Sequence, residues 1–286
     1  MRWLGRVALL ALLALTTSFA SVARGDHEDD ETNALFANAT KALVEGRPGD
    51  AIAGFEALAD RGVIDPQVSL DRGLAYAARV RISAEVPGDL GRAAHGFEEA
   101  RELTASPKVA EDASRALAIV RAEVARRRAQ AGQPAEVDPG ISLGRSIVGL
   151  VPENVWGSIA LLGSLALGVA LFVRARTART TEMRRRRVGA ETATAISLPV
   201  LVACTVLMLA ARADRLHRRE GVIVSANARP AGEDHLTLSS AAALPEAARV
   251  EIVPSAEEKP GWTRVRWASV EGWLPSTSVR VISRPE

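Results

Sequence analysis

The spacing of apolar residues changes along the chain and predicts three kinds of structure. Over residues 33–130 apolar positions recur at helical spacing, and strand patterns are rare. Residues 155–173 and 193–211 carry no charge over nineteen positions each, a length at which a helix can cross a bilayer. From residue 221 apolar and polar positions alternate, as in short strands. The pattern predicts a multidomain membrane protein with all-α repeats, a two-helix transmembrane hairpin and a small all-β barrel.

Small and aromatic residues recur within the helical region. The positions concerned are Ala39, Ala42, Gly46, Ala51, Phe55 and Leu58 in one segment, and Gly73, Tyr76, Ala93, Phe97 and Ala100 in the next. Small residues let two antiparallel helices approach closely, and a large apolar side chain fills the gap beside them. This pattern resembles the tetratricopeptide repeat, with Leu58 where Ala is usual and an insertion around 82–90. A run over 109–128 predicts a third-repeat or capping helix, and a generic helical bundle is the alternative.

Such repeats bind peptides or proteins in a groove formed by the first helix of each pair. The repeat register places six residues on that groove: Asn33, Phe36, Thr40, Gln67, Leu70 and Leu74. Ordinary packing or a solvated surface is the competing interpretation for most of them. No basic cluster that would hold a terminal carboxylate is apparent in the register, so the ligand class stays open.

The C-terminal alternation predicts five short strands with turns between them. Their apolar positions are Val222, Val224, Ala226, Leu236, Leu238, Val250, Ile252, Trp262, Val265, Trp267, Trp273, Val279 and Val281. The sequence Gly261-Trp262, an alternating strand and then Gly272-Trp273 resembles the bacterial SH3-like domain. Trp262, Trp267 and Trp273 are expected to form the core of a barrel that needs large side chains to close. An aromatic shelf for a peptide or a cell-wall stem is the second interpretation.

The N-terminal segment and the charges beside the apolar segments predict how the chain crosses the membrane. Residues 1–23 have the positive start, short apolar run and small-residue cleavage sites of a signal peptide, with an uncleaved anchor as the alternative. The loop 174–192 contains seven arginines: Arg174, Arg176, Arg179, Arg184, Arg185, Arg186 and Arg187. By the positive-inside rule it is cytoplasmic, and Trp156 is expected at the membrane interface. A buried soluble hairpin is the alternative for the two apolar segments.

The predicted organisation has nine segments. They are a signal peptide at 1–23, an acidic leader at 24–32, helical repeats at 33–130, a linker at 131–154, transmembrane helices at 155–173 and 193–211 around the basic loop 174–192, a juxtamembrane linker at 212–220 and the SH3-like domain at 221–286. Both folded domains are then expected outside the cytoplasm.

Composition argues against several classes of function. The formal net charge is +2, and residues 24–140 carry 15 basic and 21 acidic side chains, which argues against a nucleic-acid partner. A single cysteine, Cys204, excludes an intramolecular disulfide framework and a cysteine-based metal cluster. The acidic pairs Glu98–Glu99 and Glu257–Glu258 are interpreted as solvated faces. With no phosphate loop, nucleophile elbow or zinc helix in the sequence, we expect no enzyme, metal or cofactor, and a cryptic hydrolase is a weaker option.

The order of the segments resembles that of the BatE-type proteins of bacterial aerotolerance operons over nearly the full chain. The resemblance implies a non-catalytic inner-membrane adaptor that works beside von Willebrand factor A-type membrane proteins and, indirectly, a MoxR-type ATPase. The alternative is an envelope sensor or peptidoglycan-binding protein in which the SH3-like domain is the reader.

Overall fold

The computed structural model describes residues 30–138, 153–177, 184–234, 236, 242–255 and 259–284. The predicted signal peptide lies outside these residues. The chain divides into two compact units, one made of the residues up to Asp138 together with Arg219–Glu286, and the other of Pro139–Arg218. The first unit is therefore assembled from both ends of the chain, and the second contains the two long apolar helices.

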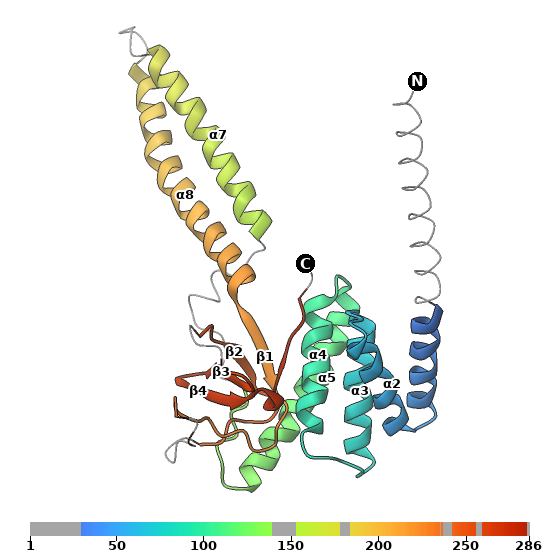
Figure 1. Ribbon diagram of the computed structural model, residues 1–286. Helices are drawn as coiled ribbons and strands as arrows, with labels where there is room; N and C mark the ends of the chain where they lie inside the picture. Colours follow the sequence, from blue (N-terminus) through green and yellow to red (C-terminus); the bar gives the residue numbers. More distant parts are fainter. Residues whose placement is uncertain are drawn as a thin grey trace, which may run out of the picture. The chain divides into compact units, whose positions relative to one another are not determined.

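The first unit begins with a helix over residues 30–44. It is followed by α2 (Pro48–Asp60), α3 (Pro66–Arg81), α4 (Asp89–Leu103) and α5 (Pro107–Gln130), which pack side by side in chain order (Figure 1). Proline occupies the first turn of α2, α3 and α5, where its missing N–H costs no helical hydrogen bond.

The recurring small and aromatic residues form the interior of this helical layer. Phe55 and Phe97 are fully buried, as are Ala51, Ala93 and Ala100. A Cβ atom added to Gly73 would lie 2.7 Å from the ring of Phe97, so glycine is what permits α3 and α4 to approach. The predicted packing role is confirmed for the buried positions, whereas Gly46 is exposed, with a φ of +75°, in the turn after the first helix.

The same unit contains a curled antiparallel sheet. Its strands are β1 (Arg219–Ile223), β2 (Arg249–Ile252), β3 (Trp262–Trp267), β4 (Val270–Pro275) and β5 (Val279–Val281), in the spatial order β4-β3-β2-β1-β5. A 3-10 turn over Ser276–Ser278 separates β4 from β5, so the single strand expected between Trp273 and Val281 is two strands. The expected strand around Leu236 and Leu238 lies mainly outside the described residues.

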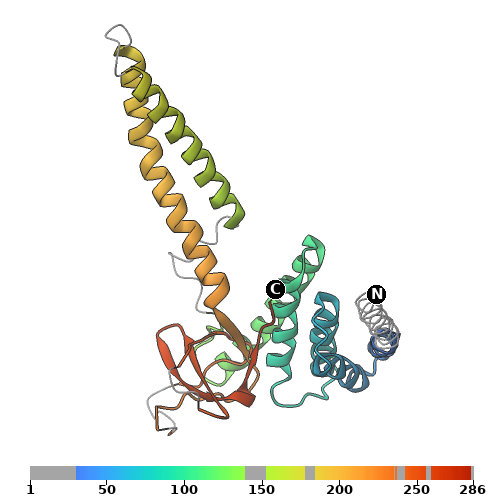
Figure 2. The same ribbon diagram turned by 45° about the horizontal axis from the view of Figure 1, so that its top comes forward.

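Helices and sheet share one hydrophobic core, in which α4 packs directly on β1 (Figure 2). A Cβ atom added to Gly91 would lie 2.4 Å from the carbonyl oxygen of Ile223, and one added to Gly88 would lie 2.3 Å from that of Val224. Gly88 also has a φ of +93°, which favours glycine. Gly88, within the insertion around 82–90, and Gly91, directly after it, therefore both lie against the residues of the sheet. Val137, in the predicted linker, is buried in the same core.

The second unit is a pair of long helices, α7 (Glu153–Thr177) and α8 (Arg184–His217). Asn154–Val173 and Glu191–Ala213 span 20 and 23 residues, and their apolar 18-residue windows have mean hydropathies of 2.0 and 2.2. Both helices are therefore long and apolar enough to cross a membrane, and few of their described residues are buried within the hairpin.

Small residues line the contact between the two helices. Ala160, Ala170 and Cys204 are buried, and Gly163 lies against Leu201. Small residues at these positions let the two helix backbones approach closely. Cys204 therefore serves as a small packing residue.

Candidate functional site

Ion pairs cross the junction between the helices and the sheet of the first unit. Arg249 of β2 lies 3.1 Å from Glu98 and 2.8 Å from Glu102, both on α4. Arg280 of β5 contacts both carboxylate oxygens of Glu56 on α2, at 2.8 and 2.9 Å. Each pair joins residues that are more than a hundred positions apart in the sequence, so the pairs hold the two ends of the chain together.

Glu98 is the centre of this junction. Its carboxylate is fully buried and accepts hydrogen bonds from Arg101 at 2.5 Å, Arg121 at 2.8 Å and Arg249. The expectation that Glu98 and Glu99 form a solvated face is wrong, because both are buried. Their side chains diverge, as neighbours on a helix do, and each meets its own set of cations.

Glu99 belongs to a second buried group that binds the end of the sheet. It accepts a hydrogen bond from Arg72 of α3 at 2.5 Å and one from the backbone N–H of Ser283 at 3.2 Å. The His95 Nε2 atom lies 2.8 Å from the carbonyl oxygen of Val281, and its Nδ1 lies 3.3 Å from the Arg72 guanidinium. Because a carbonyl oxygen only accepts, we assign the ring proton to Nε2.

Burial sets the protonation of these groups. It lowers the pKa of His95 to about 4, although the charge of Glu99 acts in the opposite direction. Burial also acts to raise the pKa of Glu99 and of Glu56, but nearby cations and hydrogen-bond donors outweigh it, and both carboxyl pKa values lie below their usual range. His95 is therefore neutral, and the carboxylates charged, near neutral pH.

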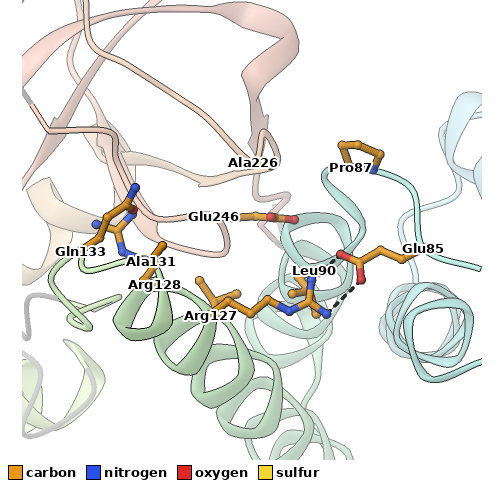
Figure 3. A pocket seen from close by; sticks show the side chains of 10 residues that line it. Glu85, Pro87, Leu90, Arg127, Arg128, Ala131, Gln133, Ala226 and Glu246 are labelled. Atoms are coloured by element: carbon orange, nitrogen blue, oxygen red, sulfur yellow. Dashed lines mark hydrogen bonds and ion pairs between the residues drawn. The ribbon is translucent and has the colours of Figure 1, made fainter. Parts of the chain in front are cut away.

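A pocket of about 520 Å³ opens where α4, α5 and the loops of the sheet meet (Figure 3). Its wall combines apolar side chains with charged ones. The apolar part includes Leu90 and Val124, and the charged part is formed by Glu85, Arg127, Arg128 and Glu246. In Figure 3 Arg127 and Glu85 lie at one end, Arg128 and Gln133 at the other, and Glu246 between them.

Two of the pocket's charged groups are already engaged. Arg127 forms a two-point contact with Glu85, at 2.6 and 2.9 Å. Glu246 accepts a hydrogen bond from the backbone N–H of Gly91 at 2.8 Å, so it caps the first turn of α4. Burial raises the pKa of Glu246, which weakens it as a counter-charge for neighbouring cations.

Arg128 differs from the other cations of the pocket. Its Nε donates to the carbonyl oxygen of Pro134 at 2.8 Å and its Nη1 to that of Ala243 at 3.3 Å. Among the described residues no carboxylate lies within ion-pair distance of it, and burial lowers its pKa. The guanidinium is therefore partly desolvated without a neutralising charge.

The six groove candidates have different environments. Asn33, Gln67 and Leu74 are exposed, Phe36 and Thr40 are partly buried, and Leu70 is buried in the core. Leu74 exposes 40% of its surface, which is unusual for leucine within a packed helical layer. The structure thus leaves part of the predicted set accessible on the 30–44 helix and α3.

The three tryptophans of the sheet lie on two faces. Trp267 packs against the core, and its indole N–H donates to the carbonyl oxygen of Val137 at 3.3 Å. By strand alternation Trp262 and Trp273 share the opposite face. Trp273 is buried with the Lys259 ammonium 5.0 Å from its ring centre, and Trp262 is half-buried.

The predicted membrane-orienting arginines lie at the ends of the hairpin helices. Arg174 and Arg176 belong to the end of α7, and Arg184 to Arg187 begin α8, whereas Arg179 lies outside the described residues. Trp156 lies in the first turns of α7, partly buried.

Sequence patterns did not indicate Arg128, Arg249 or Arg280. In the sequence each resembles an ordinary surface arginine, because Arg249 and Arg280 find partners in distant segments and both partners of Arg128 are backbone carbonyls. The only signal was local: Arg249 and Arg280 each stand next to valines within a short alternating strand, where a charge on a covered face needs a buried partner.

Comparison with known proteins found no matching family model, no similar curated protein and no similar solved structure. Among the residues that the structure describes, no group of three His, Cys, Asp or Glu side chains is arranged to hold a metal ion.

Proposed function

We propose that the chain is a non-catalytic inner-membrane adaptor whose tetratricopeptide-like helices and SH3-like sheet form one head outside the cytoplasm. The distribution of contacts in the first unit carries this proposal. The hydrogen bonds and ion pairs to the strands and their connecting loops come mainly from α2, α4 and α5, whereas Asn33, Gln67 and Leu74 stay exposed on the first helices of the pairs. A helical face therefore remains open to a protein partner.

Separate observations support the helical repeats and the SH3-like sheet. The buried small and aromatic residues of α2, α3 and α4 match the repeat pattern. The sheet pairs its first strand with its last and joins Ala231 to Trp273 by an isolated bridge, which is the curling that a small barrel requires. These features support helical repeats and an SH3-like domain.

The membrane topology rests on the hairpin and its charges. Two apolar helices of span length are connected by a segment whose ends carry six of the seven predicted orienting arginines. The positive-inside rule places that connection in the cytoplasm, and both ends of the chain then lie on the opposite side. The same arginines are suited to contact anionic lipid head groups.

The proposed partners are von Willebrand factor A-type membrane proteins, with a MoxR-type ATPase acting indirectly, as the BatE-type resemblance implies. Because helices and sheet share one core, partners bound to each would be held in a fixed relation. That arrangement raises their effective concentration without a flexible linker.

Photo-crosslinking in native membranes tests this function. A photoreactive residue at Leu74, on the open helical face, should capture a membrane protein with a von Willebrand factor A domain. The same residue at Ala53, which is exposed on α2, is the matched control and should not. If both positions, or neither, capture that class of protein, the adaptor function is wrong. Point substitutions are preferable to deleting residues 33–130, because the deletion would also remove the helices against which the sheet packs.

A second candidate function is peptidoglycan binding by the sheet. The observation in its favour is the outer face of β3 and β4, where half-buried Trp262 lies near Lys259 and Trp273. If this function is correct, the full chain in detergent should sediment with purified sacculi and Trp262→Ala should abolish the binding. Trp267→Ala is not an equivalent test, because Trp267 packs against the core.

A further inference from the structure

We propose that the pocket between α4, α5 and the loops of the sheet binds the free carboxylate end of a peptide, with Arg128 as the partner of the carboxylate. The apolar part of the wall, Leu90 and Val124, would contact the last side chain of the peptide. This ligand site is separate from the open helical face, and it does not depend on the adaptor function.

The two arginines of the pocket are in unequal states, and this difference favours a carboxylate as the ligand. Arg127 is neutralised by its two-point contact with Glu85. Arg128 has two backbone carbonyls as its hydrogen-bond partners and no described carboxylate within ion-pair distance. A guanidinium is planar and presents several N–H donors, which suits a carboxylate better than a single acceptor atom. An incoming anion would supply the charge that this partly buried cation lacks.

The pocket wall has both apolar and polar parts, and this combination favours the end of a peptide as the ligand. A volume of about 520 Å³ lies within the range of roughly 300–1,000 Å³ that is common for ligand pockets. Leu90 and Val124 provide an apolar surface, while Gln133 and Glu246 offer groups that can pair with a peptide amide. A purely inorganic anion would leave the apolar part unused. A peptide whose last residue is apolar and carries the free carboxylate fits both parts.

The pocket also lies where a ligand would bridge both layers of the unit. Leu90 and Val124 come from α4 and α5, and Ala226 and Glu246 come from the loops of the sheet. Glu246 caps α4 from the sheet side. Ligand binding would therefore add contacts across the same junction that the ion pairs of Glu98 hold.

The test uses the full chain in detergent micelles and two fluorescein-labelled peptides of sequence Gly-Ala-Ala-Leu. One peptide has a free carboxylate and the other a C-terminal amide. Fluorescence anisotropy should show binding of the acid at least tenfold tighter than that of the amide. Equal affinities for the acid and the amide peptide, or no binding of the acid at millimolar peptide concentrations, would overturn the proposal.

Three variants locate the site. Arg128→Gln should weaken binding of the acid at least tenfold, and Arg128→Lys should retain part of it. Arg126→Gln is the matched control, since Arg126 is exposed on the same helix and pairs with Glu123, and it should leave the affinity unchanged. Ala131→Leu, which adds apolar volume at the pocket wall and alters no charge, should weaken binding of the acid even if Arg128→Gln does not fold. Acid binding that survives Ala131→Leu, or that falls equally in Arg126→Gln, contradicts the proposed site.

Discussion

At the scale of single residues, buried charge fixes the helices to the sheet. Glu98 is fully buried and faces three arginines, of which Arg249 comes from the sheet. Removing one partner of a buried ionic group leaves the others uncompensated, which costs about 3–5 kcal/mol. We therefore predict that Glu98→Gln lowers the free energy of unfolding by about 3 kcal/mol, measured by guanidinium denaturation of the full chain in detergent with tryptophan fluorescence as the readout.

The matched control for this prediction is Glu111→Gln. Glu111 is exposed on α5 and pairs with Arg115 one turn away, at 2.7 Å. Exposed pairs of this kind contribute roughly 0.2–1 kcal/mol. Similar losses for Glu98→Gln and Glu111→Gln would show that Glu98 is not the centre of the junction.

His95 makes the junction sensitive to acid. Its folded pKa of about 4 lies below the usual histidine value of 6.5, so the unfolded chain takes up the proton first as the pH falls. The stability that depends on neutral His95 is complete above about pH 6.5 and is lost between about pH 6.5 and 4. At 1.36 kcal/mol per pKa unit this loss amounts to roughly 3 kcal/mol.

Denaturation at a series of pH values tests the role of His95. His95→Gln keeps a donor for the Val281 carbonyl but cannot titrate, so the variant should show a flatter stability profile between about pH 6.5 and 4.5. Below that range it should still lose stability, because the lowered pKa values of Glu56 and Glu99 make those carboxylates acid-sensitive as well. An unchanged slope would mean that His95 does not titrate in this range.

At the scale of elements, the contact of α4 with β1 depends on glycine. A Cβ atom on Gly91 would meet the backbone of Ile223 at 2.4 Å and of Val224 at 2.6 Å, and neither can move without displacing a paired strand. Gly91→Ala should therefore cost about 1–3 kcal/mol as overpacking. Gly49→Ala is the opposite case, since nothing lies within 4 Å of that position in the first turn of α2, and it should be neutral or stabilise by about 0.5–1 kcal/mol. Thermal unfolding should show a lower melting temperature for Gly91→Ala and an unchanged or higher one for Gly49→Ala.

The periodicity of the sequence was sufficient for most of these elements. Small residues marked the contacts between the helices, and alternation located β1, β2 and β3. It was not sufficient where a tertiary contact sets the boundary. The turn over Ser276–Ser278 interrupts an alternating run because β5 must leave β4 to pair with β1.

At the scale of the whole molecule, the first unit joins segments on both sides of the hairpin in the chain. We predict that it unfolds in one cooperative transition and that residues 221–286 expressed alone are susceptible to proteases. The reason is that isolated strands would expose Val222 and Ile223, which α4 and the core cover. Limited proteolysis of the full chain and of the isolated segment measures this. A protease-resistant isolated segment would show that the sheet is an independent domain.

The proposed topology can be tested because the chain has a single cysteine. In a Cys204→Ser background, an impermeant maleimide added to bacterial spheroplasts should label Ser276→Cys, which is exposed in the unit that holds the sheet. Thr180→Cys, between the two spans, should be labelled only after lysis. The reverse pattern would place the arginines outside the cytoplasm and contradict the orientation.

The sequence by itself determined most of the helical segments, the strands β1 to β3 and which two helices are long and apolar enough to cross a membrane, since these depend on local periodicity and composition. It also located the packing positions around Phe55 and Phe97. Only the tertiary structure decided that the helices and the sheet share one core and that Glu98 and Glu99 are buried. Only it revealed the pocket beside Arg128. The physical reason is that these features depend on charges and surfaces brought together from segments more than a hundred residues apart, and the local spacing of residues carries no information about which distant segments meet.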